Sequence, residues 1–397
     1  MLDGIRERFI RAKQTSLQRR LTSEDLARIN EMLANLAKGE AATRPSRYWE
    51  ELNKMNMAQL NEQGYENFKK TIALNYFTWM RILPWDSQII FLCKNLSVGT
   101  IARALRGAFT ICRQSYFASL GVLQSFSYGF LTLLLWEYLF KLSPSAGMMA
   151  LREPAEGNPP IVNPRPGMAV SQDLGNSLLE FGTFEQAIPS AGPSTILELG
   201  AGYGRNAYTI LSLRPQAKYV VVDIPPALWV AERYLSAIFP DKRIFRYRDF
   251  DRFDSIADEY SKAQIVFVLA SQLSSIPPES ADLIINISSL HEMRRDQIDF
   301  YFEQFGRILK PGGHAYIKEW KVGKVLFEGI TLSEADYRPP AGWTKVLNRT
   351  ARVQTKFFES LYKKGLGCWS VSDLANQQRW TISRLWWNFA PKSSLAI

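Results

Sequence analysis

The chain has 397 residues, which at roughly 150 residues per domain predicts two or three domains and a sizeable buried core. Apolar residues make up 46% and charged residues 22%, a composition that is typical of a soluble globular protein and excludes collagen-like, disordered and coiled-coil chains. The formal net charge is +10, and residues 1–150 hold 19 basic against 12 acidic residues, so most of the excess lies there. Such a surface can meet nucleic acid, an anionic membrane or an anionic substrate, or it can be a solvated face only.

The few cysteines and histidines exclude other classes. Three cysteines without a C-x-x-C pair fit neither a disulfide framework nor a zinc site, and they indicate a reducing compartment. Because the N-terminus also lacks an apolar signal segment, we predict a cytoplasmic protein. Only His291 and His314 are present, so no metal site is expected. The apolar run Phe126–Phe140 is shorter than the about 20 residues of a membrane span and predicts a buried helix.

The first part of the chain, residues 1–167, is expected to form a mostly helical N-terminal domain that ends in a Pro/Gly-rich connector. Large apolar residues recur at the three- to four-residue spacing of helices after Ser23, over 47–80 and over 99–142. Pro and Gly then cluster over 143–167, which indicates a connector or an ordered extended loop.

From residue 168 to the end, short apolar strands alternate with amphipathic helices. This alternation predicts an α/β fold, a doubly wound parallel sheet of Rossmann-like type, in a second domain over 168–397 that ends in an aromatic extension. A capped helix is expected over 171–181, and the chain after about 321 shows no clear pattern. The predicted strands are 195–199, 219–222, 265–269, 283–287 and 315–318, with a further short strand within 243–248. The predicted helices are 203–213, 227–238 and 297–309.

The most informative segment is a glycine-rich loop between the first of these strands and the helix after it. It contains Gly200, Gly202 and Gly204 and begins next to Glu198 at the end of the strand. Glycines let the backbone turn tightly and approach a ligand without a Cβ in the way. The next strand ends in Asp223, where a carboxylate can accept hydrogen bonds from both hydroxyls of a ribose. The segment therefore predicts a nucleoside-containing cofactor.

Two cofactor classes use such a loop. The dinucleotide pattern G-x-G-x-x-G/A is met only from Gly202 to Ala207, two residues late relative to the strand. The acid-x-G-x-G-x-G pattern of S-adenosylmethionine sites fits from Glu198 to Gly204 with no shift. S-adenosylmethionine carries a sulfonium and an ammonium against one carboxylate, so an acid beside the loop suits it and repels a pyrophosphate. We therefore predict S-adenosylmethionine as the cofactor.

The predicted cofactor contacts follow the strand ends. They are Glu198, Gly200, Gly202 and Gly204 around the methionine part, Asp223 on the ribose, Ile224 beside the adenine, and Ser271 and Gln272, after the third strand, at the expected adenine contact.

The predicted base lies just past the fourth strand. His291 follows that strand at the carboxyl edge, where ligands bind in open α/β sheets. A base helps a hydroxyl to act as a nucleophile, and an imidazole with an ordinary pKa of about 6.5 is suited to that role. Glu292 is the second candidate, or it orients His291. A structural histidine bonded to a loop carbonyl is the alternative.

Several segments carry a family resemblance that spans about residues 45–365. The segments are 47–53 (RYWEELN), 64–69 (GYENFK), 75–77 (NYF), 153–159 (EPAEGNP), 171–174 (SQDL), 198–205, 222–228 (VDIPPAL), 286–293 (NISSLHEM), 318–320 (KEW) and 357–362 (FFESLY). With them, the chain resembles the sugar O-methyltransferases of bacterial polysaccharide and secondary-metabolite gene sets, which are class I S-adenosylmethionine-dependent methyltransferases. The segment 308–313 (ILKPGG) resembles the turn before the fifth strand of class I methyltransferases.

The resemblance implies methyl transfer to a hydroxyl of a sugar, in a small molecule or a glycan. Three sites depart from the family's usual residues. His291 stands where Gln is usual, Glu319 stands in place of Gln in Lys-Gln-Trp, and Ala270-Ser271 replaces Pro-His before Gln272.

Aromatic side chains provide candidate contacts for the acceptor and for other partners. Trp49, Tyr65, Tyr76 and Trp79 are candidates for sugar stacking, although such spacing also fits a helical core. The tail interleaves tryptophans with arginines over 379–387, a pattern that would suit a lid, a homo-oligomer contact or weak association with a membrane surface.

Two other functions remain open. One is a non-catalytic peripheral membrane or scaffold protein with a vestigial methyltransferase fold, and the other is an NAD-dependent oxidoreductase. A nucleic-acid partner is not expected, because no basic–aromatic recognition module is present.

Overall fold

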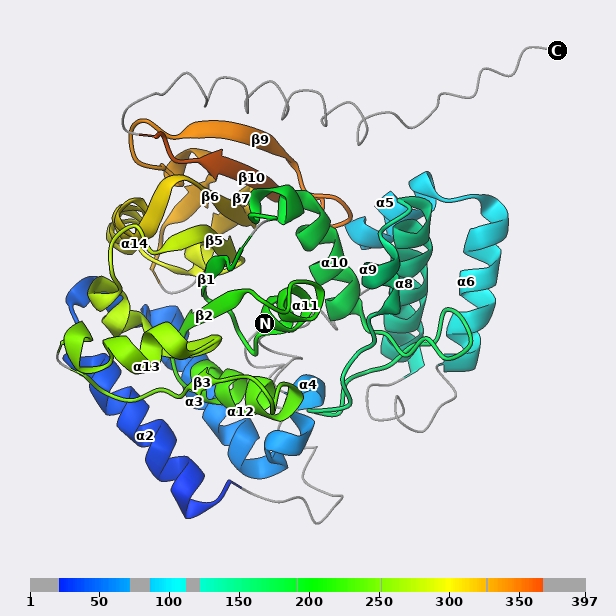
Figure 1. Ribbon diagram of the computed structural model, residues 1–397. Coiled ribbons are helices and arrows are strands. Elements are labelled where there is room, and N and C mark those ends of the chain that lie inside the picture. Colours follow the sequence, from blue (N-terminus) through cyan, green and yellow to red (C-terminus); the bar gives the residue numbers. More distant parts are fainter. Residues whose placement is uncertain are drawn as a thin grey trace.

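The computed structural model describes residues 21–71, 86–111, 122–190, 192–250, 252–325 and 328–366. Its centre is an eight-stranded sheet with the strand order β3-β4-β2-β1-β5-β6-β10-β9 (Figure 1). The strands are β1 (Thr195–Leu199), β2 (Lys218–Asp223), β3 (Ile244–Phe245), β4 (Ile265–Leu269), β5 (Ala281–Ile287), β6 (Leu309–Trp320), β9 (Thr344–Thr350) and β10 (Phe357–Lys363). A separate two-stranded sheet pairs β7 (Val322–Lys324) with β8 (Thr331–Ser333).

The sheet is parallel from β3 to β6 and antiparallel at β10 and β9. The predicted α/β, doubly wound, Rossmann-like sheet is therefore confirmed. Strand β1 lies between β2 and β5, so the strand order reverses there. In open α/β sheets this reversal leaves a crevice at the carboxyl ends of the strands, the usual place for a ligand.

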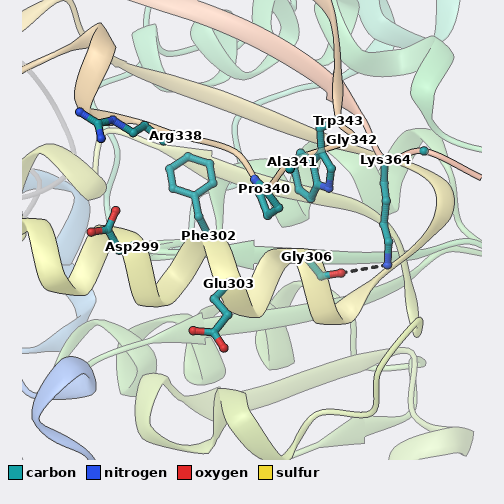
Figure 2. A pocket seen from close by; sticks show the side chains of 11 residues that line it. Asp299, Phe302, Glu303, Gly306, Arg338, Pro340, Ala341, Gly342, Trp343 and Lys364 are labelled. Atoms are coloured by element: carbon teal, nitrogen blue, oxygen red, sulfur yellow. Dashed lines mark hydrogen bonds between the residues drawn. The ribbon is translucent and has the colours of Figure 1, made fainter. Parts of the chain in front are cut away.

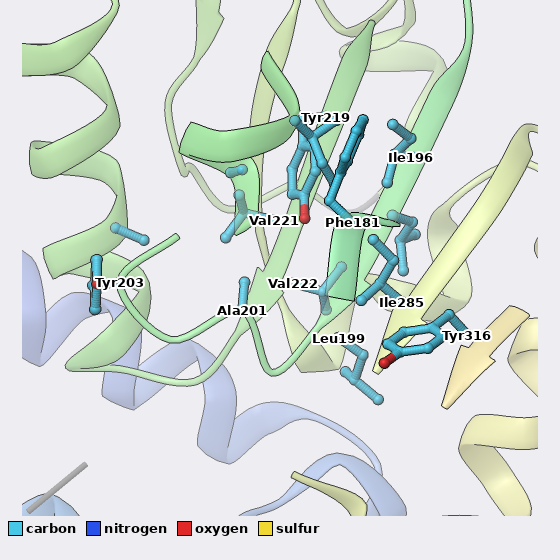
Figure 3. Packing of buried hydrophobic residues seen from close by; sticks show 14 of the residues in the cluster. Phe181, Ile196, Leu199, Ala201, Tyr203, Tyr219, Val221, Val222, Ile285 and Tyr316 are labelled. Carbon is cyan, nitrogen blue, oxygen red and sulfur yellow. The ribbon is translucent and has the colours of Figure 1, made fainter. Parts of the chain in front are cut away.

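The strands form where the sequence is apolar throughout, because both faces of a parallel sheet are covered. All five residues of β4 are buried, and so are the last five of β2. Figure 3 shows Phe181 beside Tyr219 and the branched side chains of β1, β2 and β5. Since every one of these residues is buried, the crevice rests on a closely packed core.

Helices surround this sheet. Helix α12 packs on β2 and β4, α14 packs on β6, and α10 lies between α8 and α11. The helices after the connector are α10 (Gln172–Phe184), α11 (Arg205–Leu213), α12 (Ala227–Ile238), α13 (Ala257–Lys262) and α14 (Arg295–Ile308). The helices before it are α2 (Ser23–Lys38), α3 (Arg47–Gln63), α4 (Phe68–Thr71), α5 (Ser87–Asn95), α6 (Val98–Ile111), α8 (Val122–Lys141) and α9 (Ala146–Ala150).

The N-terminal helices form two groups. Helices α2, α3 and α4 lie together on the side of the sheet where β3 and α12 lie, whereas α5, α6 and α8 lie beside α10 (Figure 1). The apolar run Phe126–Phe140 falls within α8, which is largely buried, as predicted. None of the helices in the described ranges is long and apolar enough to cross a membrane.

Glycines explain where the observed elements depart from the predicted ones. Helix α3 ends at Gln63 because Gly64 has a φ of 76°, so the helical spacing predicted from 47 onward is interrupted there. Helix α11 begins at Arg205, two residues later than predicted, because Gly204 is in the left-handed region. The Pro311–Gly313 turn lies within β6, where the backbone of Gly312 and Gly313 pairs with Lys364.

Candidate active site

A cavity of about 580 Å³ opens at the carboxyl ends of the central strands. This volume lies within the range of small-molecule sites. Its lining includes the glycine loop after β1, the end of β2 and the segment after β5, with α3 and Trp320 on the other side. The cavity therefore brings the predicted cofactor loop and the predicted base into one space.

The glycine loop has the backbone geometry for which its glycines are required. Gly200, Gly202 and Gly204 all have positive φ values, of 73°, 59° and 88°. A Cβ on Gly200 would lie 2.4 Å from the Oγ of Ser289, so the loop after β1 touches the segment after β5. Gly200 and Gly202 line the cavity, whereas Gly204 packs against Leu235.

Asp223, at the end of β2, holds this loop in place. Its Oδ2 accepts a hydrogen bond of 2.7 Å from the Gly202 N–H, and its Oδ1 accepts one of the same length from the Ile224 N–H. Asp223 and Ile224 both line the cavity. Since the Gly202 N–H is already engaged, it is not directed at a ligand phosphate.

Glu198 lies at the buried end of the same loop. Its Oε1 accepts a 3.0 Å hydrogen bond from Asn206 Nδ2, and its Oε2 accepts a 2.7 Å bond from the Tyr219 hydroxyl. Asp173 lines the cavity too and accepts a 2.9 Å bond from the hydroxyl of Tyr203. Every one of these donors is neutral, so both carboxylates are hydrogen-bonded without an ion-pair partner in the described part of the chain.

Burial raises the pKa of the carboxyl groups around the cavity. It raises the pKa of Asp173, Glu198 and Asp223 to about 7, although hydrogen bonds oppose this change. The pKa of Glu292 is raised to about 8, mainly by burial, with His291 opposing the rise and Glu319 and Asp223 adding to it. The cavity therefore holds carboxyl groups that a bound cation would ionise.

His291 is oriented by a buried carboxylate. Its Nδ1 lies 2.7 Å from Oε2 of Glu319, which is completely buried. Because a carboxylate only accepts hydrogen bonds, Nδ1 carries the imidazole proton and donates a hydrogen bond to Glu319. The other oxygen of Glu319 accepts 2.9 Å bonds from the Ser289 and Leu290 N–H groups. Burial lowers the pKa of His291, but Glu319 and Glu292 outweigh it and the pKa is raised. In the neutral imidazole, whose proton is on Nδ1, Nε2 can act as a base.

Glu292 lies beside this imidazole. Its Oε1 is 3.5 Å from Nε2 of His291, and its Oε2 is buried with no hydrogen-bond partner among the described residues. Its backbone carbonyl accepts a 2.9 Å bond from the Ser46 hydroxyl, immediately before α3. A ligand hydroxyl placed between His291 and Glu292 could therefore hydrogen-bond both to the imidazole Nε2 and to a carboxyl oxygen of Glu292.

The pleat of β6 explains why Glu319 faces His291. Successive residues of a strand point to opposite faces, so Lys318 and Glu319 diverge on β6. Lys318 bonds to Oε1 of Glu180 at 2.7 Å and to Gln354, whereas Glu319 faces His291. Two of the three departures from the resembled family, at 291 and 319, are thus in contact.

Two other buried carboxylates, those of Glu180 and Glu153, do not line the cavity and form ion pairs with cationic side chains. Oε2 of Glu180 accepts a 2.6 Å bond from Arg205, and its Oε1 is shared with Lys318. Glu153 likewise accepts a 2.5 Å bond from Lys69, which is buried between aromatic rings. Although Arg205 lines the cavity, its guanidinium is already occupied by Glu180 and Ser177.

The side of the cavity away from the glycine loop is aromatic. Tyr48 and Trp49 come from α3, and Trp320 and Phe357 come from the facing ends of β6 and β10. The Trp320 ring lies 5.8 Å from the His291 ring and 5.1 Å from that of Phe357. An acceptor beside His291 would therefore meet aromatic faces.

The structure places the remaining predicted residues elsewhere. Neither Ser271 nor Gln272 lines the cavity, although Ala270 before them does. The Gln272 amide accepts a bond from the Leu269 N–H and donates one to the Arg248 carbonyl. Ser271 packs closely against Gly39 after α2. The predicted adenine contacts of this pair remain predictions.

The other sequence candidates also differ in position. Trp49 lines the cavity, whereas Tyr65 is buried beside Phe68 and Trp229. His314 is buried on β6 outside the cavity, and burial lowers its pKa to about 4. Tyr76, Trp79 and the tail over 379–387 lie outside the described residues.

Some site residues were missed from the sequence. Glu319, Tyr48 and Asp173 all belong to the resembling segments, but the residues alone give them no role. Only the unusual acid at Glu319 was a signal, because it replaces an amide.

A second cavity, of about 660 Å³, lies against α14 (Figure 2). Asp299 and Glu303 of the helix line it, together with Arg338 and Trp343 of the loop before β9. Lys364 donates a 2.9 Å bond to the Gly306 carbonyl at its edge. This cavity contains none of the predicted site residues. In the described ranges, no group of three or more His, Cys, Asp or Glu could hold a metal ion.

Comparisons with known proteins find methyltransferases. A family model described as "Methyltransferase domain" matches residues 197–315, from β1 into β6. O-methyltransferase 3 of Dictyostelium discoideum is 24% identical over 200 residues, which cover 48% of this chain and 42% of that protein. The chain thus matches about two fifths of the length of this relative.

Solved structures with a similar fold include two methyltransferases. Mitomycin 7-O-methyltransferase is 16% identical, with a TM-score of 0.34 over 48% of this chain and 55% of the other. Phosphoethanolamine N-methyltransferase 1 of Haemonchus contortus, solved with phosphoethanolamine and S-adenosylhomocysteine, is 15% identical, with a TM-score of 0.31 over 53% of this chain and 49% of that one. Likeness at this level carries no argument about the acceptor.

The domain match covers both the glycine loop and the predicted base. Residues 197–315 include Gly200, Asp223 and His291. The match and the sheet together support a methyltransferase of the class I, S-adenosylmethionine-dependent type.

Proposed function

We propose that the chain is an S-adenosylmethionine-dependent O-methyltransferase that methylates a hydroxyl of a sugar, carried by a small metabolite or a glycan. One observation carries the proposal. An imidazole whose Nδ1 is bonded to a buried carboxylate opens on the same cavity as a glycine loop held by Asp223. The first group suits deprotonation of a hydroxyl, and the second suits a nucleoside-containing methyl donor.

The residues around the cavity fit the charge of this donor. Asp173, Glu198, Asp223 and Glu292 line it, against Arg44, Arg205 and Lys324. Arg205 is neutralised by Glu180, and Arg44 and Lys324 are exposed, so the inner wall is acidic. Such a wall favours a sulfonium and an ammonium over a pyrophosphate. The Gly202 N–H, engaged by Asp223, also counts against a dinucleotide.

When bound, S-adenosylmethionine supplies an activated methyl group, and this chain's residues position it and prepare the acceptor. Glu198 and the glycine loop would hold the methionine part, and Asp223 would hold the ribose hydroxyls with Ile224 beside the adenine. These contacts are part of the proposal.

His291 acts on the acceptor. With its Nδ1 proton held by Glu319, His291 would take the hydroxyl proton at Nε2 while the acceptor oxygen bonds to the methyl carbon, the methyl–sulfur bond breaks and S-adenosylhomocysteine leaves as the thioether. Glu319 stabilises the imidazolium that forms and keeps the ring in this tautomer. Glu292, 3.5 Å away, hydrogen-bonds to the acceptor or takes over as the base.

The aromatic side of the cavity supports a sugar as acceptor. Tyr48, Trp49 and Trp320 offer apolar faces to the C–H groups of a pyranose, and Gln354 offers an amide to its hydroxyls. The weak membrane association and the homo-oligomer suggested by the tail remain predictions.

Calorimetric titration tests the cofactor. We expect S-adenosylmethionine and S-adenosylhomocysteine to bind and NAD not to bind. Tight binding of NAD alone would replace the proposal with the oxidoreductase alternative, and binding of neither would favour a non-catalytic scaffold.

A metabolite screen tests the acceptor. Purified protein, methyl-labelled S-adenosylmethionine and fractionated lysate are combined, and labelled products are identified by mass spectrometry. We expect the label on a sugar oxygen. Label found consistently on nitrogen or carbon would contradict O-methylation.

A further inference from the structure

One face of α10 brings an acid and an amide to the cavity beside the glycine loop. Asp173 and Asn176 are three residues apart in this helix, so their side chains are neighbours on one face. Both residues line the 580 Å³ cavity, and each is only 6% exposed. Because buried polar side chains are normally hydrogen-bonded, the partners of these two residues determine what the face can bind.

Asp173 uses only one of its two carboxylate oxygens. Its Oδ2 accepts the 2.9 Å bond from the Tyr203 hydroxyl, whereas its Oδ1 accepts no bond from any residue in the described ranges. Arg205 also lines the cavity, but its guanidinium is bonded to Glu180 and Ser177. Within the part of the chain that the structure describes, Asp173 therefore has a carboxylate oxygen without a donor.

The side-chain amide of Asn176 is not hydrogen-bonded to any described residue either. It lies at the cavity wall, one turn of α10 beyond Asp173. An amide donates hydrogen bonds through Nδ2 and accepts them through Oδ1. The face of α10 therefore presents a negatively charged acceptor and, next to it, a neutral donor. A few polar groups of this kind are what fixes the orientation of a small molecule in a cavity.

The glycine loop holds the Asp173 carboxylate in place. Tyr203, which donates to Asp173, belongs to that loop, and its ring lies 5.4 Å from the rings of both Phe68 and Tyr234. The ammonium of the buried Lys69 lies 5.0 Å from the centre of the Tyr203 ring. Because these contacts enclose the ring, the Tyr203 hydroxyl has a fixed position and keeps the carboxylate beside the loop.

The amino-acid end of S-adenosylmethionine has charges that match this pair. It carries an α-ammonium and an α-carboxylate on the same carbon. A carboxylate accepts charge-assisted hydrogen bonds from an ammonium, and an amide N–H donates to a carboxylate. Glu198 and Asp223 differ from Asp173, because both oxygens of each already accept a hydrogen bond. Asp173 is therefore the better match for the ammonium.

We propose that Asp173 and Asn176 form the subsite for the α-amino-acid end of the methyl donor. Oδ1 of Asp173 accepts from the ammonium, and Nδ2 of Asn176 donates to the carboxylate. Tyr203 is a positioning residue here, because it acts on the ammonium through Asp173. The inference rests on the proposed function, since it assigns contacts to the proposed donor, and it adds two binding residues to those predicted from the sequence.

Calorimetric titration of the full chain with shortened ligands tests the acid. S-adenosylhomocysteine carries the whole amino-acid end, whereas 5′-methylthioadenosine lacks it. D173N keeps an oxygen that can accept the Tyr203 bond but removes the negative charge. We expect D173N to weaken the binding of S-adenosylhomocysteine about tenfold to a hundredfold and to change that of 5′-methylthioadenosine by less than about twofold.

A second pair of ligands tests the amide. Decarboxylated S-adenosylhomocysteine keeps the ammonium but has no carboxylate. N176A should weaken the binding of S-adenosylhomocysteine about tenfold and leave that of the decarboxylated ligand within about twofold of the unaltered chain. Y203F removes only the bond that holds Asp173, so it should show the ligand preference of D173N with a smaller loss, of about twofold to tenfold.

D223N is the matched control, because it makes the same change at the proposed ribose contact. It should weaken S-adenosylhomocysteine and 5′-methylthioadenosine alike, since both contain the ribose. Circular dichroism checks the fold of each variant. If D173N weakens both ligands equally or weakens neither, the subsite inference fails while the proposed function stands. If the unaltered chain binds neither ligand, the proposed function fails and this inference fails with it.

Discussion

Two sets of buried carboxylates in this protein differ in one respect. Glu180 and Glu153 are each bonded to buried cations, Glu180 to Arg205 and Lys318, and Glu153 to Lys69. Asp173, Glu198 and Asp223, at the cavity, have only neutral donors. Both sets are nearly inaccessible to solvent, so burial does not distinguish them. The presence of a bonded cation does, and we call Glu180 and Glu153 the paired set and Asp173, Glu198 and Asp223 the unpaired set.

This difference reverses the sign of their pH dependence. Burial raises the pKa of Glu180, but Arg205 and Lys318 outweigh it, so the pKa is lowered and its stabilisation is lost as the pH falls. Burial raises the pKa of Asp173, Glu198 and Asp223 to about 7, so the folded state binds more protons and loses stability as the pH rises from about 4 to 7. A cationic ligand would therefore stabilise the ionised form of the second set.

The largest expected effect is on turnover, at His291, the proposed base beside the cavity carboxylates. His291→Ala should reduce turnover about 10²–10⁴-fold, because the acceptor hydroxyl loses its general base. The affinity for S-adenosylmethionine should change little. Steady-state kinetics and calorimetry on one preparation measure both. Glu292→Gln is the companion variant: a larger loss there than in His291→Ala would assign the base to Glu292, and unchanged turnover in both would leave His291 with a structural role.

The next effect is on stability, in the paired set. Glu180→Gln should lower the free energy of unfolding by about 3–5 kcal/mol, because Arg205 and Lys318 would remain buried without their counter-charge. Urea unfolding followed by circular dichroism measures this. Glu137→Gln, at a pair whose Arg165 is half exposed, is the control and should cost about 1 kcal/mol or less.

A smaller effect is expected on cofactor binding, in the unpaired set. Asp223→Asn keeps the size of the side chain but removes the charge, and it should weaken S-adenosylmethionine binding about tenfold to a hundredfold. Its Tm should fall far less than that of Glu180→Gln. A variant that binds the donor normally would contradict the ribose assignment, and one that unfolds like Glu180→Gln would contradict the comparison itself.

The smallest effect is on protons released during binding. At pH 7 the carboxyl groups with a pKa of about 7 are half protonated, and a bound cation favours their ionised form. Binding of S-adenosylmethionine should therefore release protons, and its affinity should rise from pH 6 to pH 8. Calorimetry in buffers of different ionisation enthalpy counts these protons. Proton uptake, or an affinity that falls with pH, would contradict the assignment.

The sequence predicts the sheet and the loop well, because both depend on local patterns. Strands 195–199 and 265–269 and helix 227–238 have the predicted bounds, since continuous apolar runs and helical spacing determine them. The glycines of the loop have the positive φ values that their positions require.

The site could be predicted only in part, because side-chain partners are set by distant residues. The contact of His291 with Glu319 crosses 28 positions, and only the neighbouring strands β5 and β6 bring them together. Gln272 lies at the predicted strand end, but its amide is taken by two backbone groups, which no local pattern reveals.

The hydrogen bond from Ser46 to the Glu292 carbonyl joins residues 246 positions apart. The segment before α3 leaves the ribosome long before the carbonyl that it bonds to has been synthesised, by about 12–50 s at typical elongation rates. Arg28 donates a hydrogen bond to the Tyr247 carbonyl, 219 positions later in the chain, so the delay between the synthesis of these two residues is almost as long. During translation, then, the part of the cavity wall closest to the N-terminus is made first, and the pocket can be complete only after Phe357, the last residue of its lining, has been synthesised.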